Sequence, residues 1–570
     1  MLSRQHGLML RLLDPLQKIL PGQALPPELS TPWSALRGER TAVQIAIDWR
    51  WQDGQPFEQE TVLSVRTTAR SLALHDVALV PVRLAAWPDH DEQYLTDQPG
   101  LLPDRLVPCP FQMDPDHVAI CPVRLLANQT HVIWLEWQVP DDAPAGPVSF
   151  QIQLAVQGEA ATVLTTEKTL QVIDMNLPPQ TLIHTEWFHT DCLADYYQVP
   201  VFSQAHWQAI GAFMRMAADH GINMILTPLF TPPLDTAIGG ERTTVQLIDV
   251  LREGGEWTFD FARLRQWIDL ARASGIEYFE MSHLFTQWGA AAAPAIYAGL
   301  EQGRVRVFGW DTDAAGPEYA AFLAAFLPRL TEKLRQWGLS GRVFFHVSDE
   351  PQPQHLEQYR RCKSMITPWL DGFPIIDALS DLELYQSGAV DHPIPANNHI
   401  DAFLDAGVPH LWTYYCCGQT RYVSNRFMAL PSLRNRVLGV QLYLFRIEGF
   451  LHWGYNFYNR RLSRDQINPF AVTDADASFP AGDPFLVYPG SEYQPEPSLR
   501  LKVLEQGLQD QRALQCLEAL TSRRDVVDLI ERESGQAVTF SSWPPDAGWL
   551  LRLRHQVNLA IAEAVENGQN

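Results

Sequence analysis

The chain has 570 residues, more than one ordinary folded core accommodates, so its length predicts two large domains. Hydrophobic residues make up 46% and charged residues 19%, a balance that is typical of a globular protein and argues against a disordered chain. The formal net charge of −23 would repel nucleic-acid phosphates and anionic lipid surfaces, so it argues against nucleic acid and membranes as partners.

The N-terminal stretch does not have the pattern of a secretory leader. Arg11, Asp14 and Lys18 interrupt its apolar residues, whereas a signal peptide needs an uninterrupted apolar segment. The chain has no run of about 18 apolar residues, the length that a membrane-spanning helix requires. The seven cysteines are an odd number without metal-ligand spacing, which indicates reduced thiols. We therefore expect a cytoplasmic protein.

Residues 25–178 have the pattern of a β-sandwich domain. Short segments that alternate between apolar and polar residues, such as 42–48 and 131–139, are separated by Pro, Asp and Gly. Helical signals are scarce in this region. Two consecutive prolines, Pro178 and Pro179, suit an extended linker and mark its end.

Residues 179–525 alternate between strand-like and helix-like segments, which predicts parallel strands joined by helices. Eight candidate strands are present, the number that a closed (β/α)8 barrel of the TIM type needs. They span 182–187, 223–227, 277–281, 342–347, 374–377, 389–391, 410–413 and 449–453. Among the helices, 203–221 has Ser203 to cap its start and Gly221 to end it. Residues 526–570 are expected to form a C-terminal helical extension.

Two adjacent carboxylates, Asp349 and Glu350, follow the fourth candidate strand. In barrels of this kind the catalytic residues lie at the carboxyl ends of the strands, so this pair is the candidate reactive centre. The same residue types are also favoured at the start of a helix, where they complement unpaired N–H groups and the helix dipole. Both interpretations are open at the level of the sequence.

Neighbouring acids suit a glycoside cleavage in which the substrate supplies the nucleophile. Glycosidases with two independent carboxylates place them about 5 Å apart or further, on opposite sides of the scissile bond, which sequence neighbours cannot easily do. In the substrate-assisted alternative, the carbonyl oxygen of a 2-acetamido sugar attacks its own anomeric carbon. Glu350 would then act as general acid and base, and Asp349 would orient the acetamido group and stabilise its developing charge. The neighbouring charge is also expected to raise the pKa of Glu350.

Four segments resemble the retaining β-N-acetylgalactosaminidases of glycoside hydrolase family 123 and their relatives. They are 347–351, 412–416, 449–456 and 486–490 with Arg500 following, and the resemblance extends over nearly the whole chain. It implies a sandwich followed by a (β/α)8 barrel, no metal or organic cofactor, and the roles given above for Asp349 and Glu350. It also implies a terminal β-linked N-acetylhexosamine as substrate, with N-acetylgalactosamine favoured, on an oligosaccharide or glycoconjugate.

Other residues at predicted strand ends are candidates for substrate binding. Aromatic walls there would hold the sugar ring and the acetamido methyl group, and polar side chains would hold hydroxyls. The candidates are Trp187, His189, His283, Tyr414, Tyr415, Trp453 and Asn456. For each of them, packing inside the barrel is an equally good explanation. Because strands alternate their faces, only one of the two neighbouring tyrosines is expected to point inward.

Two rival functions are compatible with the same residues. The first is a conventional retaining glycosidase with a separate carboxylate nucleophile, for which Glu186 and Glu448 are candidates. The second is a carbohydrate-binding protein without catalytic activity. His184 and His189 near Asp191 lack a recognised ligand spacing, so we predict no metal site there.

Overall fold

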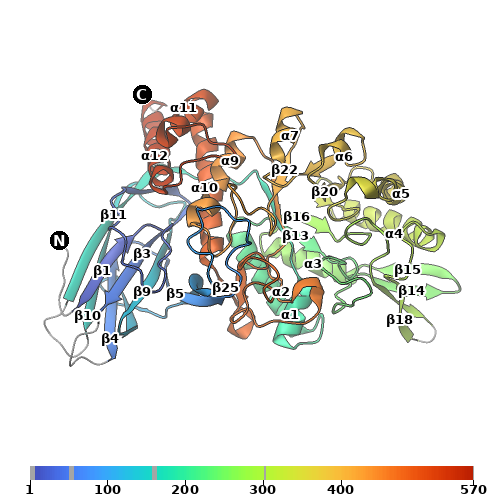
Figure 1. Ribbon diagram of the computed structural model, residues 1–570, viewed down its shortest axis with the longest axis horizontal. Coiled ribbons are helices and arrows are strands. Elements are labelled where there is room, and N and C mark those ends of the chain that lie inside the picture. The colour runs from blue at the N-terminus through green and yellow to red at the C-terminus, as the bar shows by residue number, and fades with distance from the viewer. Residues whose placement is uncertain (1–6, 51–56, 157–162, 301–302, 569–570) are drawn as a thin grey trace. The chain divides into compact units, whose positions relative to one another are not determined.

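The computed structural model describes residues 7–50, 57–156, 163–300 and 303–568 (Figure 1). The chain divides into two compact units that do not follow chain order. The first unit comprises Met1–Gln180, Ser424–Leu444 and Glu496–Asn570, and the second comprises Thr181–Val423 and Phe445–Pro495. Two late segments of the chain thus belong with the N-terminal region.

The first unit contains two β-sheets, with strand orders β1-β3-β9-β5-β6 and β2-β11-β10-β4-β8-β7. Neighbouring strands are antiparallel except for β2 and β11, which are parallel, and Figure 1 shows β1, β3 and β9 side by side. The strands are β1 (Leu8–Leu13), β2 (Trp33–Arg37), β3 (Arg40–Trp49), β4 (Glu58–Thr67), β5 (Leu72–Val82), β6 (Gly100–Pro108), β7 (Gln112–Met113), β8 (Val118–Leu126), β9 (Gln129–Gln138), β10 (Gly146–Val156) and β11 (Val163–Asn176).

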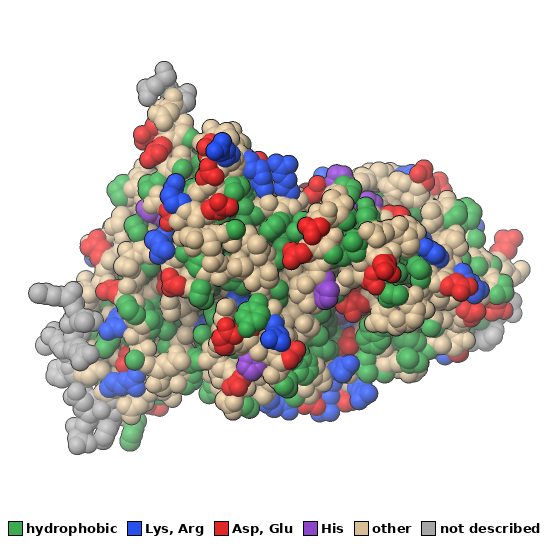
Figure 2. Space-filling model, turned by 45° about the horizontal axis from the view of Figure 1, so that its top comes forward, with side chains coloured by type: hydrophobic (Ala, Val, Ile, Leu, Met, Phe, Trp, Pro, Cys, Tyr) green, Lys and Arg blue, Asp and Glu red, His purple; other side chains and the backbone are tan. Residues whose placement is uncertain are grey.

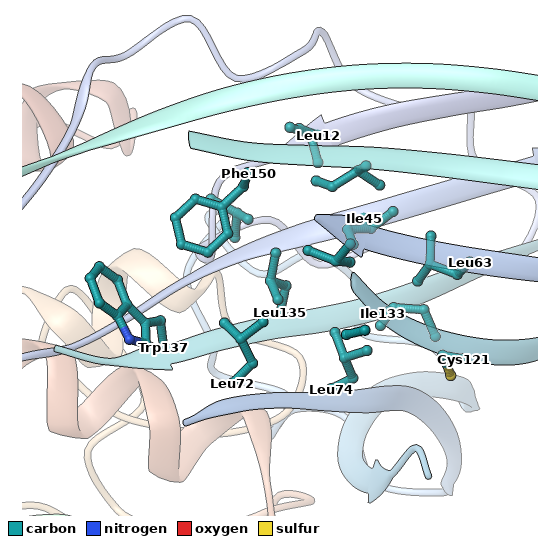
Figure 3. Close-up of a cluster of buried hydrophobic side chains, with 14 of the residues drawn as sticks. Leu12, Ile45, Leu63, Leu72, Leu74, Cys121, Ile133, Leu135, Trp137 and Phe150 are labelled. Carbon is teal, nitrogen blue, oxygen red and sulfur yellow. The ribbon is translucent and has the colours of Figure 1, made fainter. Parts of the chain in front are cut away.

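One apolar core lies between these sheets (Figure 3). Ile45 and Leu135 enter it from the first sheet, and Leu63 and Phe150 enter it from the second. Along β10, buried and exposed residues alternate, as a strand with one covered face requires. The structure therefore confirms the predicted β-rich N-terminal region.

In the described part of the first unit, five helices accompany the two sheets. They are α8 (Ser432–Arg436), α9 (Leu438–Leu444), α10 (Leu499–Leu520), α11 (Arg523–Ser534) and α12 (Gly548–Gly568). Ser498 begins α10 as its cap, because its hydroxyl accepts a hydrogen bond from the backbone N–H of Leu501. Helices α9 and α10 approach closely at Gly439, where a Cβ would lie 1.8 Å from the carbonyl oxygen of Gly507.

The second unit has an α/β architecture with parallel strands. A six-stranded parallel sheet has the order β19-β16-β13-β12-β23-β22, and β20 and β21 form a separate parallel pair. Isolated bridges join Phe345 to Ile375 and Ala396 to Tyr414. These ladders confirm the parallel α/β region, but they do not establish the complete (β/α)8 barrel that the sequence predicts. The strands are β12 (Ile183–Glu186), β13 (Met224–Thr227), β16 (Tyr278–Met281), β19 (Val343–Phe344), β20 (Ile376–Ala378), β21 (His392–Ile394), β22 (Trp412–Tyr414) and β23 (Gly449–His452).

Helices and a small sheet follow these strands. The helices are α1 (Thr190–Tyr197), α2 (Gln204–Asp219), α3 (Ala262–Ala273), α4 (Pro317–Gln336), α5 (Leu356–Ile366), α6 (Leu382–Gln386) and α7 (Ile400–Asp405). A four-stranded sheet consists of β14 (Asp249–Glu253), β15 (Glu256–Asp260), β17 (Ile296–Leu300) and β18 (Gly303–Phe308). Strand β24 (Val487–Pro489) comes later, and β25 (Pro495–Pro497) spans the boundary between the units.

One predicted strand is wrong and one predicted helix start is confirmed. The segment 389–391 is not a strand, because the N–H groups of Ala389 and Val390 bond back to the carbonyl of Leu384 as the chain leaves α6. The strand forms directly after it, as β21. Ser203 caps α2 as predicted, since its hydroxyl accepts from the N–H of His206.

The described residues include no helix with both the length and the apolar character needed to span a bilayer. Acidic and basic side chains are interspersed over the face shown in Figure 2. The seven cysteines lie in the described parts of the chain, and none of them forms a disulfide.

Candidate active site

A pocket with about 620 Å³ of open space lies at the carboxyl ends of the parallel strands of the second unit. Trp187 directly follows β12, Trp453 directly follows β23, and Tyr414 ends β22. Ligands of open α/β sheets bind at this edge, because loops of several strands converge there. The residues that line the pocket are Trp187, Leu234, Asp235, Gln287, Trp288, Asp349, Glu350, Ala378, Tyr414, Cys416, Leu451, Trp453 and Phe479.

Asp349 and Glu350 both line this pocket, although they are neighbours in the chain. A regular strand would send adjacent side chains to opposite faces. The backbone at Glu350 is instead left-handed, with φ of 44°, and this break in the extended conformation brings both carboxylates to one side. Such a conformation in a residue other than glycine costs about 1–3 kcal/mol and is concentrated at functional sites.

The dyad does not cap the following helix. Gln352 precedes the short turn Pro353–His355, His355 precedes α5, and neither makes a side-chain capping bond. The Glu350 carboxylate instead accepts a hydrogen bond from the Tyr414 hydroxyl, with 2.7 Å between the oxygens. The capping interpretation of the pair is therefore wrong.

A buried charge cluster lies behind the dyad. His346 has Nε2 at 2.5 Å from Glu280 Oε1 and Nδ1 at 3.0 Å from Asp377 Oδ1, and the Tyr359 hydroxyl also donates to Asp377. Burial alone would lower the pKa of His346, but the charge of Glu280 and the bonds to both carboxylates outweigh it and raise this pKa to about 10. His346 is therefore an imidazolium at neutral pH.

The same cluster acts on Asp349. Burial, and after it the charge of Glu350, raises the pKa of Asp349 well above its usual range, while the cation of His346 opposes this rise. Asp349 is half-buried, so water screens its attraction for a nearby cation less than it would at the surface.

Buried carboxylates also hold two aromatic walls of the pocket. The indole N–H of Trp187 donates to Glu280 Oε1 at 2.7 Å, and that of Trp453 donates to Asp483 Oδ2 at 2.9 Å. Each ring therefore has its polar edge anchored and leaves its apolar surface for packing. Walls of this kind suit the apolar face of a sugar ring and a methyl group.

The structure brings together some of the predicted site residues. Asp349, Glu350, Trp187, Tyr414 and Trp453 line the pocket, and of the two neighbouring tyrosines only Tyr414 is among the lining residues.

His189, His283, Tyr415 and Asn456 are not among the lining residues. The side-chain amide of Asn456 bonds both backbone groups of His189. Its oxygen accepts from the N–H at 2.8 Å, and its nitrogen donates to the carbonyl at 3.1 Å. His283 stacks on His346 with ring centroids 4.2 Å apart, and Tyr415 packs against Phe450. These contacts give the four residues structural positions in or next to the site walls.

Sequence reasoning missed Asp235, Gln287 and Trp288, which lie in the loops after β13 and β16. Asp235 Oδ2 accepts from the backbone N–H of Leu462 at 2.8 Å, whereas Oδ1 accepts no hydrogen bond from the described residues. Burial raises the pKa of Asp235. The signal that could have found these residues is their position after barrel-type strands, because no motif marks them.

The two alternative nucleophiles from the sequence lie outside the pocket lining. Glu186 is fully buried and contacts His184 at 3.2 Å. Glu448 precedes β23, at the opposite end of the strand from Trp453, and contacts His410.

One group of side chains has the spacing of a metal site. His283, His346 and Asp377 have ligand atoms within 4.8 Å of one another. Both ring nitrogens of His346 are engaged with carboxylates, and its pKa is that of an imidazolium, which is not a metal ligand. We therefore interpret His346 and Asp377 as members of a hydrogen-bonded charge cluster rather than as metal ligands.

Comparisons with known proteins indicate a family and a fold for the chain. The family model "Glycoside hydrolase 123, catalytic domain" matches residues 187–517, more than half of the chain. A family 123 glycoside hydrolase from Clostridium perfringens, analysed for glycolipid glycan hydrolysis, superposes with a TM-score of 0.69 at 14% identity, and 98% of each chain is covered. This likeness shows a shared fold.

Two further solved structures are less similar. A family 39 glycoside hydrolase from Bacteroides cellulosilyticus has a TM-score of 0.31 at 11% identity, covering 83% of this chain and 81% of its own. A Bacteroides uniformis β-glucuronidase has a TM-score of 0.29 at 12% identity, covering 80% and 48%. No curated protein sequence matches the chain.

Proposed function

The chain belongs to glycoside hydrolase family 123 and is a glycosidase, and from this premise we propose that it removes a terminal β-linked N-acetylhexosamine with retention of configuration. N-acetylgalactosamine is the favoured sugar. The observation that carries the proposal is the adjacent pair Asp349 and Glu350, with both residues lining one pocket between anchored aromatic walls. The relative from Clostridium perfringens was analysed for glycolipid glycan hydrolysis, so the glycan of a glycoconjugate is a candidate substrate.

In the first step, the acetamido carbonyl oxygen of the bound sugar forms a bond to the anomeric carbon as the glycosidic bond breaks. The departing oxygen takes the proton of Glu350, which the Tyr414 hydroxyl holds in place. Asp349 accepts a hydrogen bond from the acetamido N–H and stabilises the positive charge of the cyclic intermediate. In the second step, Glu350 takes a proton from water, whose oxygen attacks the anomeric carbon and reopens the ring.

A second mechanism has a specific observation in its favour. Asp235 lines the same pocket and has one carboxylate oxygen without a hydrogen bond from the described residues. In a conventional retaining scheme it would be the nucleophile, and the reaction would not need an acetamido group. The two mechanisms therefore differ in the substituent that they require on the 2-position of the sugar.

A panel of aryl β-glycosides tests the proposal. We expect cleavage of the 2-acetamido galactoside and glucoside, with the galactoside faster, and no measurable cleavage of the matching 2-hydroxy galactoside. Equal rates on the 2-acetamido and 2-hydroxy sugars would contradict substrate assistance and favour the Asp235 scheme. In that case Asp235→Asn would abolish turnover, whereas substrate assistance predicts that this variant retains it.

Two further expectations stay proposals. We propose that the eight parallel strands form one closed (β/α)8 barrel. The bridge from Phe345 to Ile375, between the ends of β19 and β20, and that from Ala396 to Tyr414, between β21 and β22, support this closure. We also propose a cytoplasmic location, supported by the cysteine pattern.

A further inference from the structure

Trp288 is the exposed member of the pocket lining. The residue is 44% exposed, whereas the aromatic walls Trp187 and Tyr414 are 4% and 7% exposed. The Trp288 ring makes no hydrogen bond and no ring contact with the described residues. We therefore place Trp288 at the solvent-exposed mouth of the pocket.

The backbone that carries Trp288 is strained. Trp288, Gly289 and Ala290 have φ values of 57°, 122° and 52°, three successive residues in a region that side chains disfavour. Gly289 also lies against His355, since a Cβ there would be 3.0 Å from the imidazole ring. Strain of this kind persists only where the surroundings enforce it.

Hydrogen bonds do enforce it. Thr286 and Ala292 close the loop through two bonds of 2.9 and 3.0 Å, and Gln358 donates to the carbonyl of Ala290 at 3.0 Å. The backbone N–H of Trp288 donates to the carbonyl of Asp349 at 3.1 Å. The backbone that carries this exposed ring is thus hydrogen-bonded to the backbone of the catalytic dyad.

We propose that Trp288 is the platform of a leaving-group subsite, where it stacks on the sugar unit that departs. This inference rests on the proposed function. The terminal sugar lies between the anchored walls Trp187 and Trp453, and Glu350 must face the glycosidic oxygen. The next unit of the glycan therefore extends from Glu350 toward the open mouth, where the flat face of Trp288 matches the apolar face of a hexopyranose.

The test compares ligands with and without a leaving-group sugar. The substrate is a disaccharide whose terminal residue is the better N-acetylhexosamine of the aryl panel, and the second probe is the thiazoline of that sugar, which has no leaving group. For Trp288→Ala we expect kcat/KM on the disaccharide to fall about 10-fold, mainly through KM, because a stacking contact is lost. The inhibition constant of the thiazoline should stay within about twofold, because the sugar it mimics lies elsewhere.

Two variants serve as controls. Trp288→Phe keeps an aromatic face and should recover most of the lost kcat/KM. Trp369→Ala removes another exposed tryptophan, 36% exposed and not among the pocket-lining residues, and should behave as the wild type.

Three results would overturn the subsite. They are an unchanged kcat/KM of Trp288→Ala on the disaccharide, an equal loss of thiazoline affinity, and a loss confined to lipid-bearing glycosides. The last result would indicate that Trp288 contacts a lipid chain. A wild-type protein that neither cleaves the 2-acetamido glycosides nor binds the thiazoline would instead overturn the proposed function, and the subsite with it.

Discussion

The core between the two sheets of the first unit and the buried charge cluster around His346 in the second unit differ in the polarity of their side chains. The first is apolar, with side chains such as Ile45, Leu135 and Phe150 from both sheets (Figure 3). The second holds charged groups, with His346 between Glu280 and Asp377. Apolar packing tolerates many arrangements of similar volume, whereas a buried charge cluster has few arrangements in which every group is paired.

This difference indicates what each interior contributes. Burying one large apolar side chain stabilises a fold by about 1.5–3 kcal/mol. A buried ion pair is often no more stabilising than an apolar replacement of the same size. The charge cluster is therefore better explained by what it positions, since Glu280 anchors Trp187 and the cation of His346 acts on Asp349.

The largest expected effect is the loss of either carboxylate of the dyad. Glu350→Gln should lower kcat/KM on the aryl N-acetylhexosaminide by about 10³-fold, and Asp349→Asn by nearly as much, because proton transfer and charge stabilisation are lost. The melting temperature should change little, since each amide has nearly the size of the acid that it replaces and keeps an oxygen that accepts hydrogen bonds.

Glu448→Gln is the matched control, because this carboxylate lies at the other end of β23 and is exposed. Its kcat/KM should equal that of the wild type. An Asp349→Asn variant with more than about a tenth of wild-type activity would show that this carboxylate does not orient the substrate.

The next effect concerns the charge cluster. His346→Gln should destabilise the protein by about 3–5 kcal/mol, because it leaves two buried carboxylates without their cation. The pKa of His346 is raised to about 10 from 6.5, so its stabilisation is complete below pH 6.5 and is lost as the pH rises through 10. Thermal unfolding should therefore show a gap between wild type and variant that narrows from pH 6.5 to pH 10.

The pH dependence of kcat/KM is a second measurement on the His346→Gln variant. Asp349 must be ionised to act, and its raised pKa places the acid limb of kcat/KM above the range of an ordinary aspartate. Without the cation of His346, that limb should move to higher pH. Unfolding curves that stay parallel across the pH range, with an unmoved acid limb, would contradict the role of the cluster.

The smallest effect on catalysis is expected in the apolar interior. Leu135→Ala should cost about 2–5 kcal/mol of stability, because it removes buried methyl groups and leaves a cavity. At a temperature where the variant is folded, its kcat/KM should match the wild type. A large loss of kcat/KM in the folded variant would remove the distinction between the two interiors.

The sequence predicts what is encoded locally. The alternating pattern of β10 and the cap of α2 follow from nearest neighbours, and the dyad is a contiguous pair. Trp288 and Asp235 were missed because they lie in long loops, where the sequence has no periodicity that would show which way a side chain points.

Long-range grouping was also missed. The segments Ser424–Leu444 and Glu496–Asn570 belong with the N-terminal sheets, and contacts between such distant parts of the chain leave no periodic signal. The charge cluster around His346 is of the same kind, since Glu280, His346 and Asp377 come from three separate strands or strand ends.

In the proposed mechanism, the substrate's acetamido group is the nucleophile beside Asp349 and Glu350. A decisive experiment measures kcat/KM for aryl glycosides whose 2-acetamido group carries zero, one, two or three fluorines on its methyl carbon. Fluorine withdraws electrons from the carbonyl oxygen, so substrate assistance predicts a steep fall of about 100-fold or more across the series, or about 3 kcal/mol of barrier. A flat series would contradict substrate assistance and indicate a nucleophile supplied by the protein.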